Sequence, residues 1–166
     1  MANNDWQAFQ RTQSAVFNKE TIVSFGNIQN ELLSAAQADI LCDLSDLTTL
    51  ALSGDDALTF LQGQVTNDVN LLGVDKAHYS GYCSPKGRLL ALFLAYRQAD
   101  AIHLQFNGEL AEPIAKRLKM YVMRAKVKLD TISDVTVKLG ISGANAEQAL
   151  SAFFSTIPAL ALELRH

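Results

Sequence analysis

The chain has 166 residues, enough for one domain or for one domain and part of another. Hydrophobic residues make up 49% of it and charged residues 19%, which excludes intrinsic disorder. A net charge of −3 gives no overall attraction to nucleic acid or anionic lipid, and two cysteines cannot form a disulfide framework. The sequence has no membrane-spanning run and no recognisable signal peptide, so we expect a soluble, cytoplasmic protein.

The first elements lie in a polar stretch, residues 1–37, that we interpret as a leader. Residues 1–20 are rich in Gln and Asn and predict a loosely ordered segment with one short helix. Residues 21–25 are β-branched or aromatic and end at a Gly-Asn pair, which indicates a short strand. Apolar residues at helical spacing predict a helix over 28–37.

From residue 38 the pattern changes to strands. Residues 39–44 and 48–53 predict two strands around a Ser-Asp turn. A Gly-Asp-Asp sequence then begins a helix over 57–61, and the two acids suit the positive end of its dipole. The polar residues 62–70 follow without a core pattern of their own.

The remaining elements predict an α+β fold with a mainly antiparallel sheet. The turn Ser-Pro-Lys-Gly joins the first two of three consecutive strands. We expect strands over 78–84, 88–96, 101–106, 125–129 and 136–141, and helices over 109–120 and 143–154.

An internal similarity suggests duplication. Residues 50–57 and 139–146 share a strand-like run, a Ser-Gly pair, and an Asp or Asn near a helix start. A tight strand-to-helix turn selects such residues even without common ancestry. We favour duplication, with a first repeat over 38–131 and the truncated start of a second over 132–166.

No catalytic triad or metal cluster can be assembled from the sequence. We interpret the histidines His78, His103 and His166 as structural or surface residues. Cys42 lies in an apolar run and is most simply a small core residue. Cys83 would be reactive if Lys86 lowered its pKa, but we prefer an inert thiol.

Basic residues cluster in one strip, namely Lys116, Arg117, Lys119, Arg124, Lys126 and Lys128. The strip is either a docking surface for a polyanion or an ordinary solvated helix face followed by a strand edge protected by lysines. For nucleic acid in general the second interpretation is favoured, because aromatic residues are not interleaved and the protein is acidic. For an acidic small ligand the two are closer.

A second polar cluster follows the helix predicted over 57–61. Its amide, hydroxyl and carboxylate side chains are those of Gln62, Gln64, Thr66, Asn67 and Asp68. Such a run is usually a solvated loop with Asx turns. Amides and carboxylates also present the paired donors and acceptors that can bind the edge of a heterocycle.

Three motifs carry a resemblance to a known family. They are Phe-Leu-Gln-Gly-Gln-Val-Thr-Asn-Asp-Val at 60–69, Tyr-Cys-Ser-Pro-Lys-Gly-Arg-Leu at 82–89, and Arg-Leu-Lys-Met-Tyr-Val-Met-Arg-Ala-Lys-Val at 117–127. Over about residues 25–155 the chain resembles the folate-binding family that includes the glycine-cleavage T-protein and YgfZ, and it is most similar to the YgfZ branch. That branch is tied to tRNA modification and to the maintenance of iron–sulfur enzymes.

The resemblance implies a duplicated α+β domain whose two repeats exchange strands around a central ligand site. The implied ligand is tetrahydrofolate or a one-carbon derivative. The resemblance also implies a site built from Gln62, Gln64, Thr66, Asn67 and Asp68, with Lys86, Gly87 and Arg124 near it. Because T-proteins have an acid a few positions after Gly87 and this chain has none in 88–92, Asp68 is the only local catalytic candidate.

These observations leave three hypotheses for function. The first is a tetrahydrofolate-binding module, and the second is a folate-dependent aminomethyltransferase. The third is a scaffold that binds tRNA, another RNA or a protein such as an iron–sulfur enzyme. The chain stops before the later cysteine motif of YgfZ-like proteins, so we interpret it as an N-terminal part and expect a homodimer that restores the missing pairing partner.

Overall fold

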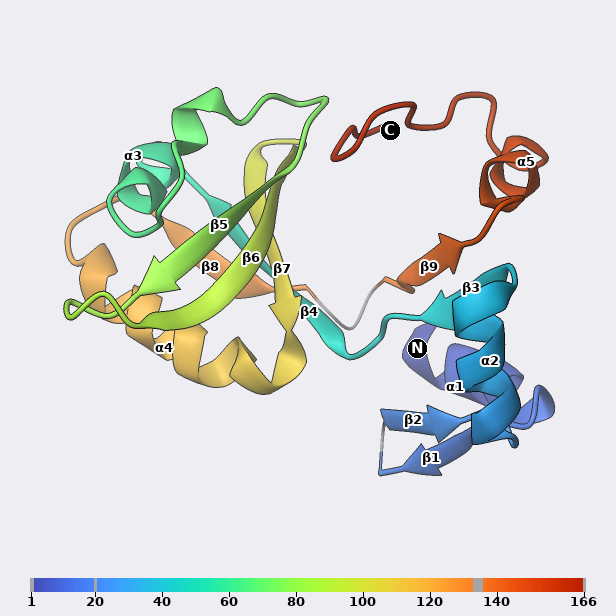
Figure 1. The fold of residues 1–166 in the computed structure, drawn as a ribbon. Coiled ribbons are helices and arrows are strands. Elements are labelled where there is room, and N and C mark those ends of the chain that lie inside the picture. The colour runs from blue at the N-terminus through green and yellow to red at the C-terminus, as the bar shows by residue number, and fades with distance from the viewer. Residues whose placement is uncertain (1, 20, 133–135, 166) are drawn as a thin grey trace. The chain divides into compact units, whose positions relative to one another are not determined.

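The computed structural model describes residues 2–19, 21–132 and 136–165. It divides into two compact units, which are considered separately (Figure 1). Unit 1 comprises Met1–Asp46 and Asp134–Ile157, and unit 2 comprises Leu47–Ser133 and Pro158–His166. Strand pairing within the described ranges is antiparallel throughout. The predicted α+β class with a mainly antiparallel sheet is therefore confirmed.

Unit 2 is built on one five-stranded sheet with the order β5-β6-β7-β4-β8. The β5–β6–β7 meander follows from tight turns, including the one at Gly87, whose φ of +75° favours glycine. The strands are β4 (Leu47–Ser53), β5 (His78–Cys83), β6 (Leu89–Gln98), β7 (Ala101–Asn107) and β8 (Lys128–Thr131).

The core of unit 2 lies between one face of this sheet and two helices, α3 (Ala57–Gln62) and α4 (Ala111–Val122). Alternate residues of each strand point to this face, as expected for a half-buried strand. Phe93 of β6 is fully buried, and its ring packs against those of Tyr82 and Phe106. Leu61 of α3 and Leu118 of α4 are also fully buried.

Two short 3-10 helices complete this side of unit 2, η1 (Val69–Leu71) and η2 (Gly108–Leu110). Val69 is fully buried in the core, although residues 62–70 show no core pattern in the sequence. Two valines in a polar stretch, Val65 and Val69, are too few to form a clear apolar period in the sequence.

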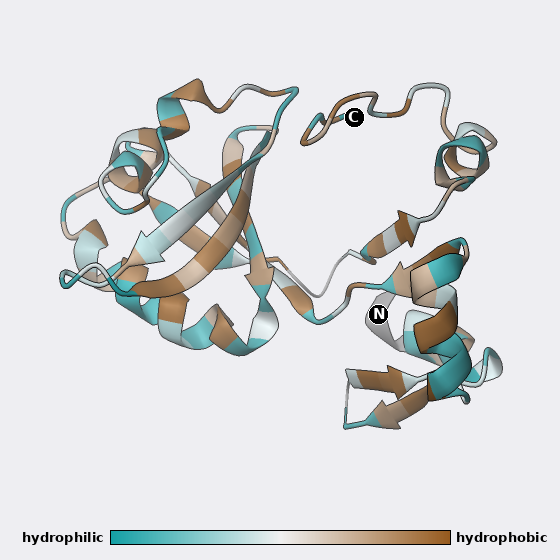
Figure 2. Cartoon of the chain, viewed as in Figure 1, coloured by the Kyte–Doolittle hydropathy of each residue, from teal (hydrophilic) through white to brown (hydrophobic). Residues whose placement is uncertain are grey.

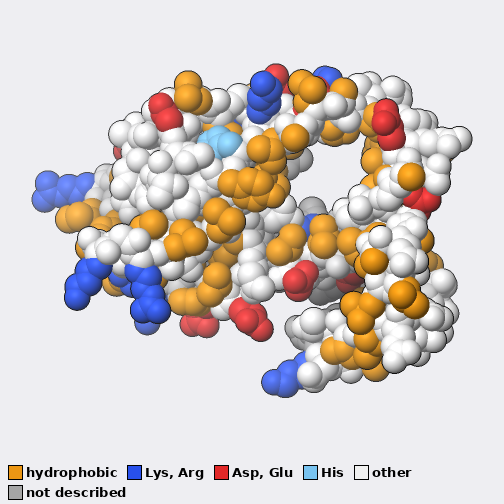
Figure 3. Space-filling model, in the orientation of Figure 1, with side chains coloured by type: hydrophobic (Ala, Val, Ile, Leu, Met, Phe, Trp, Pro, Cys, Tyr) orange, Lys and Arg blue, Asp and Glu red, His pale blue; other side chains and the backbone are white. Residues whose placement is uncertain are grey.

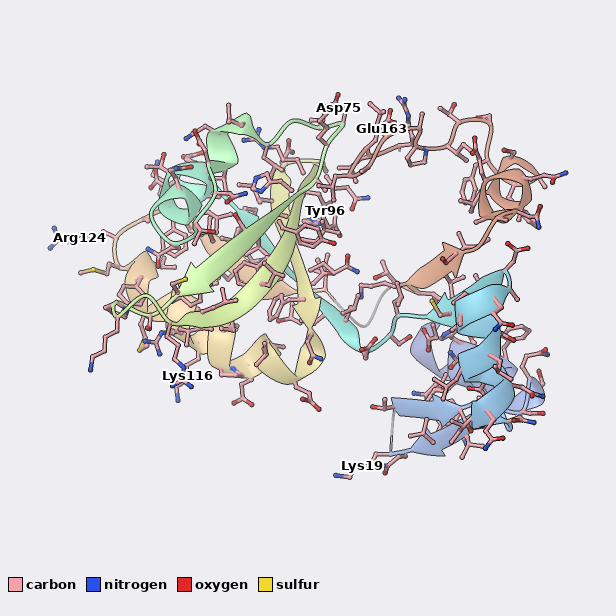
Figure 4. All side chains as sticks on the ribbon, viewed as in Figure 1. Lys19, Asp75, Tyr96, Lys116, Arg124 and Glu163 are labelled. Atoms are coloured by element: carbon pink, nitrogen blue, oxygen red, sulfur yellow. The ribbon has the colours of Figure 1, made fainter. Side chains whose placement is uncertain are left out.

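The last residues of the chain pair with the stretch before β5. The Ala77 N–H donates to the Leu162 carbonyl over 2.7 Å, and the Leu164 N–H donates to the Asp75 carbonyl over 2.8 Å. The carboxylate of Glu163 accepts the N–H groups of Ala159 and Leu160, and these bonds hold its pKa below the ordinary value. Asp75 and Glu163 are labelled in Figure 4.

Unit 1 contains helices and two separate two-stranded sheets. Strand β1 pairs with β2, and β3 pairs with β9. Only Gln10 and Ser24 are buried among the described residues of this unit, and the Gln10 amide donates to Asp43 over 2.6 Å. The elements are α1 (Ala2–Thr12), β1 (Val16–Asn18), β2 (Thr21–Ser24), α2 (Ile28–Gln37), β3 (Ile40–Asp43), β9 (Leu139–Ser142) and α5 (Ala146–Ser151).

The two glycine turns of the predicted duplication have matching surroundings. Gly54 has φ +108°, and a Cβ there would lie 2.2 Å from the Lys126 carbonyl oxygen. Gly143 has φ +127°, and a Cβ there would lie 2.5 Å from the Cα of Asp39. Each turn therefore presses its glycine against the residues just before a neighbouring strand, β8 in the first case and β3 in the second.

An Asp joins each glycine turn to that neighbouring strand. Asp56 accepts the Lys126 N–H over 2.7 Å. Asp39 accepts the Asn145 N–H over 2.8 Å and the Asn145 side-chain amide over 2.7 Å, which lowers the pKa of Asp39. Strand β3, which we assigned to the first repeat, thus pairs with the strand of the second.

Several predicted boundaries differ from the structure. The strand predicted over 125–129 begins later, at Lys128, because the Ala125 N–H still closes a turn to the Val122 carbonyl over 2.8 Å. The helix predicted over 143–154 spans only Ala146–Ser151 and has no buried residue, so no packing extends it. The strand predicted over 136–141 is β9, which begins at Leu139.

Candidate functional site

Residues 65–67 follow the free edge of β5 and extend the sheet there. Val65 forms an antiparallel bridge with Tyr82. The Thr66 N–H donates to the Gly81 carbonyl over 2.9 Å, and the Gly81 N–H donates to the Thr66 hydroxyl over 2.8 Å. A Cβ on Gly81 would lie 3.2 Å from this hydroxyl, so the glycine allows the close approach. The segment therefore covers an edge that would otherwise expose unpaired backbone groups.

Three other predicted site residues hold the backbone nearby. Asn67 donates to the Tyr79 carbonyl over 2.7 Å. Gln62 accepts the Val69 N–H over 2.8 Å, and Asp68 caps η1 by accepting the Asn70 N–H over 2.9 Å. Asp68 also accepts the Asn70 side-chain amide over 2.8 Å. Side-chain groups that the sequence predicts to bind a ligand thus form hydrogen bonds within the protein instead.

Gln64 differs from these neighbours. Its side chain is half-buried, and within the described ranges it makes no hydrogen bond. An amide in this position retains two donors and an acceptor for a ligand. Among the four residues Gln62, Gln64, Asn67 and Asp68, Gln64 is therefore the one whose side chain keeps its hydrogen-bonding groups for a ligand.

The predicted cationic residues lie at one end of unit 2. Lys86 and Gly87 form the exposed turn between β5 and β6. Arg124 is exposed beyond the end of α4 and projects away from the ribbon (Figure 4). The Tyr82 hydroxyl interacts with Arg117 of α4, so this helix lies beside the end of β5. Burial raises the pKa of Tyr82, and the Arg117 cation partly offsets that effect.

The sheet of unit 2 has a second face, opposite the core, formed by alternate residues of β4 to β8. Leu92 of β6 is 56% exposed there and pairs across the strands with Gly81. The pairing also aligns side chains in two rows across the sheet. One row is Tyr79, Leu94, Gln105 and Thr49, and the other is Tyr96, His103, Ala51 and Asp130.

Tyr96 and His103 form an aromatic pair on this second face. Their rings lie 5.1 Å apart in an edge-to-face arrangement. His103 is only 7% exposed, and its Nδ1 has no hydrogen-bond partner among the described residues. Burial lowers the pKa of His103 and raises that of Tyr96, and the side chain of Thr49 partly offsets the effect on the Tyr96 pKa. The pair places two aromatic rings and the His103 Nδ1 on this side of the sheet.

A shallow depression of about 710 Å³ lies elsewhere in unit 2, between α4 and β8. None of the eight residues predicted to bind folate lines it. Its lining residues are Ala111, Glu112, Ala115, Lys116, Lys119, Met120 and Thr131.

The described part of the chain also contains Cys, His, Asp and Glu side chains, the residue types that ligate metal ions. No group of three His, Cys, Asp or Glu side chains within it could hold a metal ion. No helix in the same ranges is long and apolar enough to span a membrane. Cys42 and Cys83 are half-buried free thiols.

Comparison with known proteins identifies the family of this chain. A family model described as the GCVT N-terminal domain matches residues 5–164. The chain belongs to this family. The GCVT domain of this chain therefore includes both units, although only unit 2 has an apolar core among the described residues.

The relatives of this GCVT domain include several curated YgfZ proteins. The chain is 34% identical over 65% of its length to the "tRNA-modifying protein YgfZ" of Vibrio vulnificus strain CMCP6, of which it covers 33%. It is 33% identical over 71% of its length to the protein of that name from Enterobacter sp. strain 638, of which it covers 36%. The chain thus spans about a third of the length of the curated relatives it matches.

A solved structure has the same fold. The glycine cleavage system aminomethyltransferase T from Bartonella henselae superposes with a TM-score of 0.77 at 19% identity, covering 89% of this chain and 42% of that one. The predicted membership of the YgfZ and T-protein family is confirmed by these comparisons.

The second face of the unit 2 sheet was not predicted from the sequence of this GCVT domain. Its residues come from separate strands and share no motif. The alternation of β6 from Leu89 to Gln98 predicts two faces, but it does not show that Tyr96 meets His103. Strand register was needed for that.

Proposed function

We propose that the chain is a tetrahydrofolate-binding module of a YgfZ-like protein that acts in tRNA modification and in the maintenance of iron–sulfur enzymes. Family membership, together with relatives that are named tRNA-modifying protein YgfZ, supports the part of this role in tRNA modification. The ligand is reduced folate or a one-carbon derivative, as the family resemblance implies. The observation that carries the proposal is the second face of the sheet, which combines the exposed side chains of Tyr79 and Leu92 with the Nδ1 of His103, unpartnered within the described ranges.

A reduced pterin is flat, with donors and acceptors around its edge. The exposed side chains of Tyr79 and Leu92, next to Gly81, offer apolar surface on which such a ring can lie. Gln105 lies in the row of Tyr79 and contributes an amide. Gln64 supplies a second free amide on the segment that borders β5. Site amides of this kind orient a ligand, while apolar contact supplies area.

The remaining predicted residues act in two ways in this proposal. Thr66 and Asn67 hold the border of the site by their bonds to β5. Gln62 and Asp68 hold η1 behind it. Lys86 and Arg124, with Gly87 at the turn, give the positive charge that an anionic glutamate tail of folate prefers.

Titration of the chain with tetrahydrofolate tests the proposal. We expect saturation at micromolar ligand, and about tenfold weaker binding, or 1.4 kcal/mol, for Gln64→Ala. The matched control is Gln98→Ala, because Gln98 is an exposed amide at the far end of β6. Absence of saturation at millimolar tetrahydrofolate would overturn the proposal.

An enzymatic outcome is distinguished by a second assay. Exchange of labelled formaldehyde into methylene-tetrahydrofolate, abolished in Asp68→Asn, would favour aminomethyl transfer instead. We expect no such exchange, because the Asp68 carboxylate is already engaged by Asn70 and residues 88–92 contain no acid.

A further inference from the structure

The outward face of α4 differs from its inward face in both polarity and charge. Ile114 and Leu118 are buried against the sheet. Lys116, Lys119 and Met120 lie on the opposite side of the helix and are exposed. Spacings of three and four residues place Lys119 and Met120 each next to Lys116. Lysine and arginine side chains gather at the end of unit 2 that carries α4 (Figure 3).

The structure divides the six-residue basic strip into paired and unpaired cations. Lys126 forms an ion pair with Asp55 at 3.1 Å, and Lys128 forms one with Asp130 at 2.7 Å. Arg117 is half-buried and interacts with Tyr82. Lys126 and Lys128 thus each have a carboxylate partner, and Arg117 is less exposed than the other cations of the strip.

The remaining three cations are Lys116, Lys119 and Arg124, which we call the cationic α4 face. None of them forms an ion pair within the part of the chain that the structure describes. All three are exposed, and Lys116 and Arg124 project outward in Figure 4. The positive charges of these three side chains are therefore available to a ligand at the surface of unit 2.

The shallow depression between α4 and β8 is lined in part by the cationic α4 face. Lys116 and Lys119 both line it, with the hydroxyl-bearing Thr131 on the strand side and Met120, 63% exposed, beside them. Phosphate oxygens accept hydrogen bonds from lysine ammonium groups and from threonine hydroxyls. A polyanionic strand lying along the depression would meet both kinds of donor.

We propose that the cationic α4 face docks the phosphodiester backbone of an RNA, a partner that rests on the proposed function in tRNA modification. Charge complementarity carries the inference, because unpaired cations are concentrated on a protein whose net charge is −3. No aromatic side chain is among the described residues that line the depression, so the face contacts backbone rather than bases. Binding is accordingly independent of sequence and dependent on salt.

The number of unpaired cations sets the expected salt dependence. Three phosphate contacts give a slope of log K against log salt of about −2 to −3. Each contact then contributes a factor of about five to the affinity near 0.1 M salt. Removal of two lysines therefore weakens binding about 20-fold and reduces the slope by about 1.5.

The test measures binding of an unmodified tRNA transcript to the chain by fluorescence anisotropy across a salt series. The double variant Lys116→Gln/Lys119→Gln removes two unpaired cations, and Lys126→Gln/Lys128→Gln removes two paired ones with the same change of charge. We expect about 20-fold weaker binding for the first variant and less than threefold for the control.

Each other outcome overturns the inference. Equal losses in the two variants would show that only net charge matters, and absence of tRNA binding would remove the RNA partner. Tighter binding of polyglutamate than of tRNA would assign an acidic protein to this face. Tetrahydrofolate titration of the same variants separates the two proposals, because the folate site can saturate normally while RNA binding is lost.

Discussion

The two units of this chain differ in how many apolar side chains they bury. Unit 2 buries a continuous set of apolar side chains between its sheet and two helices, whereas only Gln10 and Ser24 are buried in the described residues of unit 1. Helix α2 illustrates the difference. Its apolar residues Ile28, Leu32 and Leu33 are each more than half exposed, and the helix shows both brown and teal segments in Figure 2.

Charge divides between the units in the same way. Unit 2 holds eleven of the fourteen Lys and Arg residues, while unit 1 holds three of them together with eight of the seventeen Asp and Glu residues. The overall charge of −3 therefore hides a basic unit and an acidic one. The comparison teaches that whole-chain composition is a poor guide to partners when basic side chains are concentrated in one unit.

Core truncation should give the largest contrast between the units. Phe93→Ala removes a fully buried ring that contacts two others, so we expect a loss of about 4 kcal/mol in the free energy of unfolding. Leu32→Ala in α2 should cost less than about 0.5 kcal/mol, because the side chain is 67% exposed. Urea unfolding measures both, and comparable losses would contradict the comparison.

Hydrogen exchange should show the same contrast without mutation. We expect the slowest amides in β6 and β7, which have neighbours on both sides and border the core. Amides of β1 and β2, in a two-stranded sheet, should exchange at least about 100-fold faster. Equal protection in the two units, measured by mass spectrometry of peptides, would show that unit 1 is stabilised by more than its own packing.

Two glycines of unit 2 separate the cost of a positive φ from the cost of a steric contact. Gly54→Ala combines a positive φ with a Cβ 2.2 Å from a backbone oxygen, so we expect a loss of about 3 kcal/mol. Gly87→Ala has a positive φ but nothing within 4 Å of the new Cβ, and should lose only about 1 kcal/mol. Similar denaturation midpoints for the two variants would show that backbone conformation alone sets the cost.

The smallest expected effect is a pH dependence centred on His103. Burial lowers its pKa, so the unfolded chain takes up the proton first as the pH falls below about 6.5. This histidine contributes stability above that pH that is lost on acidification. We expect His103→Gln to flatten the loss of stability between pH 7.5 and pH 5.5 in urea unfolding, and an unchanged slope would contradict this account.

Local chemistry allowed much of the fold to be predicted from sequence. The helix over 28–37 matches α2, and the strands predicted at 78–84, 88–96 and 101–106 match β5, β6 and β7 to within two residues. Each has a clear apolar period and a clear turn beside it. Where packing rather than pattern sets an end, as in α5 and β8, the prediction was off by several residues.

The candidate site was less accessible to such reasoning. The amide-rich stretch could be singled out by residue type, but only the hydrogen bonds separate Gln64 from Gln62, Asn67 and Asp68. In the same way, the sequence lists six cations as one strip, and only the ion pairs to Asp55 and Asp130 divide it. Residue type determines what a side chain can bind. Its contacts within the fold determine which of its hydrogen-bonding groups and charges remain available to a ligand.

The sequence by itself determined the class of fold, the family and the polar stretches in which a site could lie, because these depend on local periodicity and short motifs. Only the tertiary structure decided that β3 pairs with β9, that Tyr96 meets His103, and which lysines remain unpaired. Those facts join residues distant in the chain. Their energies come from strand register and burial, which no local window of sequence contains.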